Sequence, residues 1–337
     1  MRKRICMVIA VAAFGCRRLP AQTLFGIEYA TEMQTDFKNL NWVNLLKVNF
    51  SQALCKGLRF DLGSISVART RAERLVDDLQ VFSNIEEENL PFSLSVAGIS
   101  FCRGRLQIFA GIRNMNEDYF TSPVTSLFTN SSCGLFPTVS VNFPIANYPL
   151  SSLGVHCAFV TEHWEVQASI YNGRGYDGFT GDNSPFRFCP ASDGLCGIFS
   201  SIYRNNGSSY CLGGVLYGGL HVCTGQTEGR SVSGALWGYA EQRVVPWLDL
   251  LVQYSMGLSS DLWCRLYGGL GMRGRFRKVE IGVFSDCAVF SGTEEWASEL
   301  TCRIPLSPHA DLQPAMHLIR GAFGFRTVAL MRLNVSL

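Results

Sequence analysis

The chain has 337 residues and a formal net charge of +2, with 47% hydrophobic and 17% charged residues. Its basic residues are few and scattered, which excludes a surface built to bind nucleic acid. Thirty-three glycines and 23 phenylalanines favour β-structure with tight turns over a bundle of helices.

Residues 1–22 form a predicted secretory signal peptide. Arg2, Lys3 and Arg4 precede an apolar run from Ile5 to Gly15, and Ala21 provides a small residue for cleavage. The run is too short to cross a bilayer as a helix, and no later stretch offers about 18 uncharged apolar residues in a row. An exported, apolar chain of this kind indicates an outer-membrane β-barrel domain over residues 23–337, because only helices and closed barrels satisfy their backbone hydrogen bonds in lipid.

Beyond residue 22, apolar and polar residues alternate with a period of two in about sixteen strand-like segments. These segments are 24–32, 43–50, 58–69, 93–101, 105–112, 152–160, 164–171, 195–203, 209–217, 231–241, 247–256, 262–272, 276–285, 297–304, 311–319 and 324–337. The last segment would be an exposed edge unless it closed onto another strand. The predicted fold class is therefore all-β, a transmembrane antiparallel β-barrel of about sixteen strands.

The connections between these segments have two lengths. Short ones lie at 102–104, 161–163, 205–207, 244–246, 273–275 and 307–309, and long ones at 70–92, 113–150, 172–194, 218–230 and 286–296. Outer-membrane barrels have short periplasmic turns and longer external loops. An ordinary soluble β-sandwich also alternates, but it has no reason to sort its connections in this way.

The alternation separates a lipid-facing set from a lumen-facing set in several segments. In 164–171 the outward residues are Trp164, Val166, Ala168 and Ile170, and in 247–255 they are Leu248, Leu250, Val252 and Tyr254. The charged and amide residues between them suggest a water-filled channel rather than a packed core. The candidate pore-lining residues on strands are Arg105, Gln107, Arg113, Glu165, Gln167, Gln253, Glu299 and Arg303.

The longest connection, 113–150, has two readings. It either folds inward, so that Asn116, Glu117, Asp118 and Tyr119 narrow the pore and contact solute hydroxyls, or it forms a solvent-exposed cap. Cys133 and Cys189 lie in long loops and are the pair considered for a disulfide, since export exposes cysteines to oxidation. No Cys or His spacing resembles a metal site, so neither a metal nor a cofactor is expected.

Several runs resemble the carbohydrate-selective porins of the OprB type. These are 110–120, 168–173, and 296–307 followed by 310–319. The resemblance implies a sixteen-stranded barrel in the outer membrane of a Gram-negative bacterium that passes sugars. It also implies that Arg113 is a pore-lining residue, and that Glu299, Arg303, Gln313 and Pro314 are structural positions of the closing hairpin. The chain departs from the family pattern in being short, in being rich in cysteine and in ending on Leu337 where an aromatic residue is usual.

The predicted function is a passive outer-membrane channel for carbohydrates. Its expected partners are small sugars, outer-membrane lipid and the barrel-assembly machinery, which would recognise the C-terminal strand, while a homo-oligomer is left open. The alternatives are a general or ion-biased porin and a surface glycan-binding or adhesin barrel that does not conduct. An enzyme is not expected, because the five histidines lie in no catalytic motif.

Overall fold

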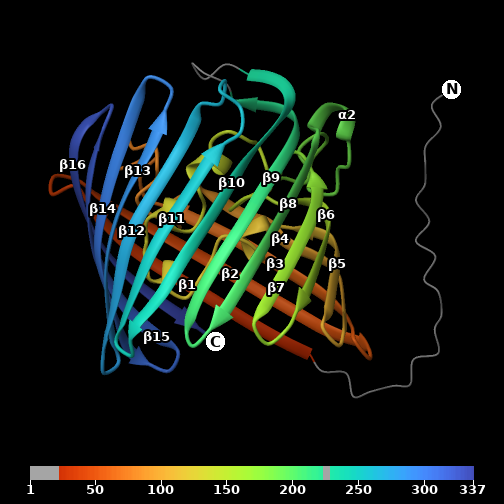
Figure 1. The fold of residues 1–337 in the computed structure, drawn as a ribbon, viewed down its shortest axis with the longest axis horizontal. Coiled ribbons are helices and arrows are strands. Elements are labelled where there is room, and N and C mark those ends of the chain that lie inside the picture. Colours follow the sequence, from red (N-terminus) through yellow and green to blue (C-terminus); the bar gives the residue numbers. More distant parts are fainter. Residues whose placement is uncertain (1–22, 223–227) are drawn as a thin grey trace.

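The computed structural model describes residues 23–222 and 228–337, so the predicted signal peptide lies outside the described residues. The described chain forms one closed antiparallel barrel of sixteen strands (Figure 1). The strands are β1 (Thr23–Thr35), β2 (Leu40–Cys55), β3 (Leu58–Arg69), β4 (Leu90–Arg103), β5 (Leu106–Arg113), β6 (Ser152–Val160), β7 (Trp164–Asn172), β8 (Leu195–Asn205), β9 (Ser208–Val222), β10 (Glu228–Val245), β11 (Leu248–Gly257), β12 (Cys264–Phe276), β13 (Val279–Phe290), β14 (Thr293–Ser307), β15 (Ala310–Gly321) and β16 (Gly324–Ser336). The predicted fold class and strand number are confirmed.

The barrel closes where its first strand pairs with its last. Glu28 on β1 lies opposite Ser336 on β16, and the register continues to the pair Thr35 and Ala329. The backbone N–H of Leu337 donates to the Ile27 carbonyl at 2.9 Å, and the Ile27 N–H donates to the Leu337 carbonyl at 3.1 Å. The terminal strand β16 is therefore paired on both sides, with β15 and with β1, and no strand edge is exposed there.

At one end of the barrel every connection is short, whereas the other end carries the long loops together with short turns such as Ser291–Gly292. Three loops are long, covering residues 70–89, 114–151 and 173–194. The prediction of a long connection at 286–296 is wrong, because β13 and β14 continue to a tight turn at Ser291–Gly292, where Gly292 adopts φ +84°. The connection expected at 218–230 is also shorter, since β9 and β10 extend into it, and residues 223–227 lie outside the described chain.

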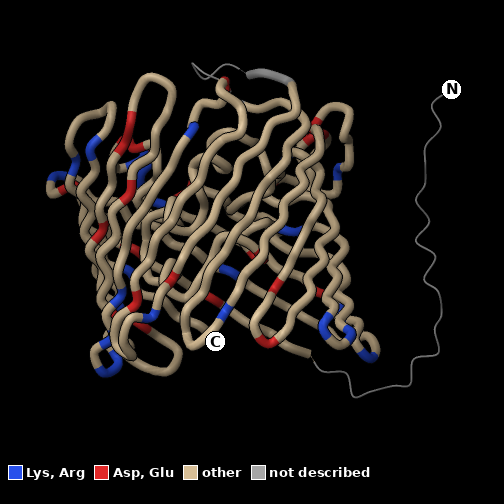
Figure 2. Tube along the Cα trace, viewed as in Figure 1, with Lys and Arg blue, Asp and Glu red and all other residues tan. Residues whose placement is uncertain are grey.

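The alternation places apolar side chains on the outside, as predicted. On β7, Trp164, Val166, Ala168 and Ile170 are exposed, whereas the inward-facing Gln167, Ser169 and Tyr171 are buried. The outer wall is therefore an apolar surface suited to lipid. Figure 2 shows many of the Lys and Arg residues at the turns along the lower rim, with the middle of the wall mostly uncharged.

The helices are short. They are η1 (Met115–Glu117), η2 (Thr125–Leu127), η3 (Ser131–Cys133), α1 (Pro137–Ser140) and α2 (Pro190–Asp193). Within the part of the chain that the structure describes, no helix is both long and apolar enough to cross a membrane.

Half of the barrel interior is packed rather than open. The loop 114–151 carries Phe120 and Phe136 against Trp237 on β10, with ring centroids 5.0 and 5.4 Å apart, and Phe136 also meets Tyr267 on β12 at 5.7 Å. These residues belong to a buried cluster built from the loop and from the inner faces of β8 to β13. The expectation of a wet channel rather than a packed core is thus wrong for this half, because the apolar residues of the inward loop pack against apolar inward-facing residues of the strands.

We expect Val252→Arg to destabilise the folded barrel by about 2–4 kcal/mol. Val252 is 46% exposed near the middle of β11, where a guanidinium would face hydrocarbon. The free energy of unfolding in lipid vesicles, measured by denaturant titration, tests this. Val252→Ala is the matched control, and an equal loss in the two variants would contradict a lipid-facing position.

Candidate functional site

The loop 114–151 folds into the barrel and is held there by Glu299 on β14. This side chain is 1% exposed and accepts hydrogen bonds from the backbone N–H of Thr129 at 2.8 Å, from the Thr129 hydroxyl at 3.0 Å and from the N–H of Asn130 at 2.9 Å. Of the two readings of this loop, its inward path is confirmed, while contact of its residues with solute stays a prediction.

Two further inward-facing glutamates act in the same way. Glu241 on β10 accepts from the Val124 N–H at 2.8 Å and from the Ser122 hydroxyl. Glu295 on β14 accepts from the N–H groups of Leu79 and Gln80, at 2.9 and 2.8 Å. Glu241, Glu295 and Glu299 are called the anchoring glutamates below, since each joins the barrel wall to an inward loop.

The second inward loop is 70–89, and it is hydrogen-bonded to the first. The N–H of Asn84 donates to the Thr129 carbonyl at 2.7 Å, and the N–H of Ser131 donates to the Val81 carbonyl at 3.0 Å. The two loops are therefore joined through their backbones, and together they bound the part of the lumen that stays open.

The open part of the lumen is a cavity of about 1100 Å³ between these loops and the wall formed by β1–β3 and β14–β16. Its lining runs from Glu87 and Glu88 on loop 70–89 to Ser307, Pro308 and His309 in the turn at the opposite end of the barrel. The cavity is therefore a passage along one side of the lumen, beside the packed half.

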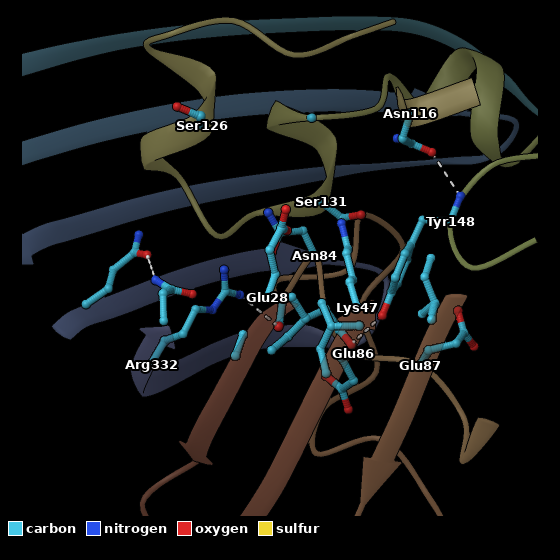
Figure 3. Close-up of a pocket in the computed structure, with 18 of the residues that line it drawn as sticks. Glu28, Lys47, Asn84, Glu86, Glu87, Asn116, Ser126, Ser131, Tyr148 and Arg332 are labelled. Carbon is cyan, nitrogen blue, oxygen red and sulfur yellow. Dashed lines mark hydrogen bonds between the residues drawn. The ribbon is translucent and has the colours of Figure 1, made fainter. Parts of the chain in front are cut away.

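The passage is lined by carboxylates, amides, hydroxyls and cations. In Figure 3, Glu28, Lys47, Glu86 and Arg332 lie on one side of the cavity, and Asn116 and Ser126 face them from loop 114–151. The polar lining residues include Glu28, Lys47, Arg69, Arg74, Asn84, Glu86, Glu87, Glu88, Asn114, Asn116, Glu117, Ser126, Ser131, Arg303, Asp311, Gln313, Arg332 and Asn334.

Several of these charges are paired with an opposite charge on the wall or on loop 70–89. Arg332 pairs with Glu32 at 2.7 Å, Arg74 pairs with Asp78 at 2.7 Å, and Arg69 lies 3.8 Å from Glu86. The charges that remain to face solute are the carboxylates of Glu28, Glu87, Glu88 and Glu117, together with the ammonium of Lys47. The passage is therefore polar and mildly acidic.

Three of the predicted pore residues line this passage. They are Asn116 and Glu117 on the inward loop and Arg303 on β14. The Asn116 side-chain oxygen accepts from the Tyr148 N–H at 2.9 Å, which orients the amide, while Glu117 is exposed. Arg303 donates to the Ser126 carbonyl and lies 3.8 Å from Asp311.

Arg113 and Asp118 are engaged with each other. The Arg113 Nε and Nη2 donate to the two Asp118 oxygens at 2.6 and 2.5 Å, and the guanidinium lies 4.6 Å from the centre of the Phe109 ring. The Arg113 side chain is 18% exposed. Its geometry fits a residue that positions the start of the inward loop.

The other predicted residues fall into two groups. Tyr119, Gln167, Gln253 and Glu299 are buried, and each hydrogen-bonds within the interface between the inward loop and the wall. Arg105, Gln107 and Glu165 lie near the short-turn end of the barrel, where Glu165 pairs with Arg204 at 2.6 Å.

Sequence reasoning missed the residues that face the inward loop. Glu28 and Lys47 are cross-strand partners on β1 and β2, and neither was selected. A signal was present, because a charge within an alternating apolar strand marks a lumen position. The run Glu86, Glu87, Glu88 also stood in a loop that was predicted only to be long.

The disulfide considered between Cys133 and Cys189 does not form. Both residues are free thiols. Cys133 is fully buried in the cluster inside the barrel, whereas Cys189 is exposed beside α2 on loop 173–194. Folding of the longest loop into the lumen separates the two sulfurs, which spacing along the chain could not reveal.

One cluster contains the residue types of a catalytic triad without its geometry. His156 Nδ1 lies 2.9 Å from the Ser169 hydroxyl and 3.6 Å from Asp118 Oδ2. In a triad the serine and the acid contact opposite nitrogens of the ring, whereas both contacts here share Nδ1. The cluster is a part of the packing between loop and wall.

A closed sixteen-stranded barrel with inward loops and a polar passage is the architecture of an outer-membrane porin. The family model of the carbohydrate-selective porin, OprB family, matches residues 28–209, and the chain belongs to this family. Fold and family point to a channel rather than an enzyme. The resemblance noted in the sequence is thereby confirmed.

Solved structures show the same fold. OprB of Pseudomonas putida at high pH superimposes with a TM-score of 0.79 at 14% identity, covering 94% of each chain. Its low-pH structure gives 0.59 at 13% identity, covering 94% of this chain and 92% of that one. A mutant of the Rhodopseudomonas blastica porin gives 0.63 at 8% identity, covering 94% of this chain and all of the other. No curated protein matches the chain in sequence.

We expect Glu299→Ala to loosen the inward loop while the barrel still closes. The N–H groups of Thr129 and Asn130 lose a charged acceptor, which costs about 1.5–3 kcal/mol. Single-channel recordings should show a larger and noisier conductance, and the heat-modifiable folded band should remain. Glu294→Ala removes the same charge from an exposed position on the same strand and is the control. Equal conductance in the two variants would contradict an anchoring role.

Proposed function

We propose that this porin is a passive channel for small carbohydrates. The observation that carries the proposal is the pairing of polar groups across the passage. Glu28 and Lys47 project from β1 and β2, and Asn116 lies opposite them on the inward loop. Glu117, the next residue of that loop, also lines the passage. A sugar needs both donors and acceptors at short range, and this set offers both.

The chemistry of permeation is non-covalent. A sugar hydroxyl exchanges water for hydrogen bonds to the carboxylates of Glu28 and Glu117, the Asn116 amide and the Lys47 ammonium. Such contacts must be weak enough for release at the far end, which exposed side chains achieve because water competes for them. Family membership supports sugars as the solute class.

One observation favours a second function, an ion-biased porin. The carboxylates of Glu28, Glu87, Glu88 and Glu117 outnumber the ammonium of Lys47 among the charges that face solute. An acidic lining raises the local concentration of cations. A cation preference is compatible with sugar passage, so the sugar experiment below separates the two functions.

We expect mono- and disaccharides to block the ion current of the refolded channel in a saturable manner. Glu117→Gln and Asn116→Ala should each weaken the block by about two- to tenfold, because one hydrogen bond contributes about 0.5–1.5 kcal/mol. Planar-bilayer recordings with titrated sugar measure the block. Glu162→Gln makes the same charge change in an exposed turn outside the lumen and is the control.

Three other results of this titration would contradict the proposal. Conductance indifferent to every sugar would indicate a general porin. Absence of conductance from a folded, heat-modifiable barrel would indicate a surface glycan-binding protein. A block weakened equally by Glu162→Gln would remove Asn116 and Glu117 from the sugar site.

We expect the cation preference to fall as the pH is lowered from 7 towards 5. Burial raises the pKa of Glu86 and of Glu87 above the usual carboxyl range, so both lose their charge at a higher pH than an exposed carboxylate would. The reversal potential in a KCl gradient measures the preference. The double variant Glu86→Gln/Glu87→Gln should begin with a smaller preference and show a smaller pH effect. An unchanged pH effect in that variant would assign it to other groups.

A further inference from the structure

The barrel wall is unusually low on one side. β5, β6 and β7 have 8, 9 and 9 residues, whereas β2 has 16 and β10 has 18. At about 3.3 Å per residue, eight or nine residues extend about 26–30 Å along the strand. A tilt of about 45° reduces this to about 19–21 Å of height, less than the apolar band of about 25 Å that a membrane barrel presents.

The loop 173–194 stands above these short strands. In Figure 1, α2 of this loop rises beyond the outer ends of β6 and β7. Tyr176 bridges to Ser151, and the N–H of Gly175 donates to the Pro144 carbonyl at 2.9 Å, so the loop is attached to the base of the inward loop. Asn172 and Tyr176 donate to Asp193 Oδ2 at 3.0 and 2.9 Å, which ties the two ends of the loop together.

The loop exposes phenylalanines where a soluble loop would expose polar residues. Phe179, Phe186 and Phe188 are 49%, 60% and 56% exposed. Phe92, at the outer end of β4, is 50% exposed and its ring centroid lies 5.7 Å from that of Phe179. These four residues are called the aromatic patch. The patch reaches from β4 to the loop between β7 and β8, and so covers the width of the low wall.

The acidic side chains of the loop all have polar partners. The Arg187 guanidinium forms ion pairs with Asp182 and, at 3.3 Å, with Asp193, and Asp177 accepts a hydrogen bond from the Asn183 amide at 3.0 Å. Paired charges beside exposed aromatic rings are suited to the boundary between head groups and acyl chains, where aromatic residues of membrane proteins gather.

We propose that the aromatic patch binds the acyl chains of outer-leaflet lipid and completes the lipid-facing belt over β5–β7. The patch continues the apolar outer wall, where Val155, Val166 and Ile170 are 52%, 50% and 62% exposed below it. The missing height of the wall is about the depth that one layer of phenyl rings adds. The occupant is therefore lipid, and a second copy of the chain or a free aqueous surface are the competing outcomes.

Site-specific photo-crosslinking in a Gram-negative host tests this on the full-length protein. Phe179, Phe186 and Phe188 are replaced one at a time by benzoyl-phenylalanine, and only the folded, heat-modifiable band is scored. We expect adducts that react with a lipopolysaccharide probe at all three positions. The same substitution at Ile170, on the lipid-facing wall, is the positive control, and at Ser126, exposed in the lumen passage, the negative control.

Two outcomes would overturn the proposal. Adducts between two copies of the chain would assign the patch to a protein interface. No lipid adduct at the three phenylalanine positions, with a lipid adduct at Ile170, would place the patch in water. If a substituted chain fails to fold, Phe179→Trp with brominated lipid provides a second measurement. Quenching of the added fluorescence by the lipid is expected, and quenching only by aqueous iodide would contradict it. Neither outcome depends on which solute the channel passes.

Discussion

The hydrogen bonding of the backbone in lipid is the constraint on which this structure depends. Hydrocarbon offers no partner for an unpaired N–H or C=O, so the sheet must close. β16 meets β1 over eight residue pairs and Leu337 still bonds to Ile27, which leaves no free edge at the seam. Once the wall is closed, alternation of side chains divides every strand between lipid and lumen. Because the outer face of the wall is apolar, the polar groups that can select a solute lie in the lumen or at the two rims of the barrel.

Inside the barrel, the buried carboxylates hold the loops in place, and the polar groups that face the passage are other, more exposed side chains. Glu241, Glu295 and Glu299 each accept hydrogen bonds from backbone N–H groups of an inward loop. This arrangement satisfies charges that would be costly to bury alone, and it gives loops of irregular structure a fixed position. The apolar side of loop 114–151 then fills one half of the lumen. Solute is confined to the remaining passage along β1–β3 and β14–β16.

At the outer rim, too, a loop provides a surface that the strands do not. Short strands on one side of the barrel lower the wall, and the loop above them carries exposed rings in place of further strand residues. Loops in this protein thus complete both surfaces that the strands leave unfinished, the narrow passage within and the lipid belt outside. The passage itself combines acidic, amide and cationic groups, and the proposed sugar and cation preferences both rest on this set.

The alternation along the chain was enough to predict the barrel, its strand number and the direction in which most side chains point. Val166 and Gln167 could be assigned to opposite faces because the period of a strand is two regardless of what surrounds it. Only the tertiary structure decided which inward groups reach solute. Glu299 and Arg113 form hydrogen bonds with loop 114–151, whereas Glu28 and Lys47 line the cavity that this loop leaves open. The path of a long loop depends on contacts between residues more than a hundred positions apart, such as Thr129 with Glu299. The local alternation of apolar and polar residues does not predict such contacts.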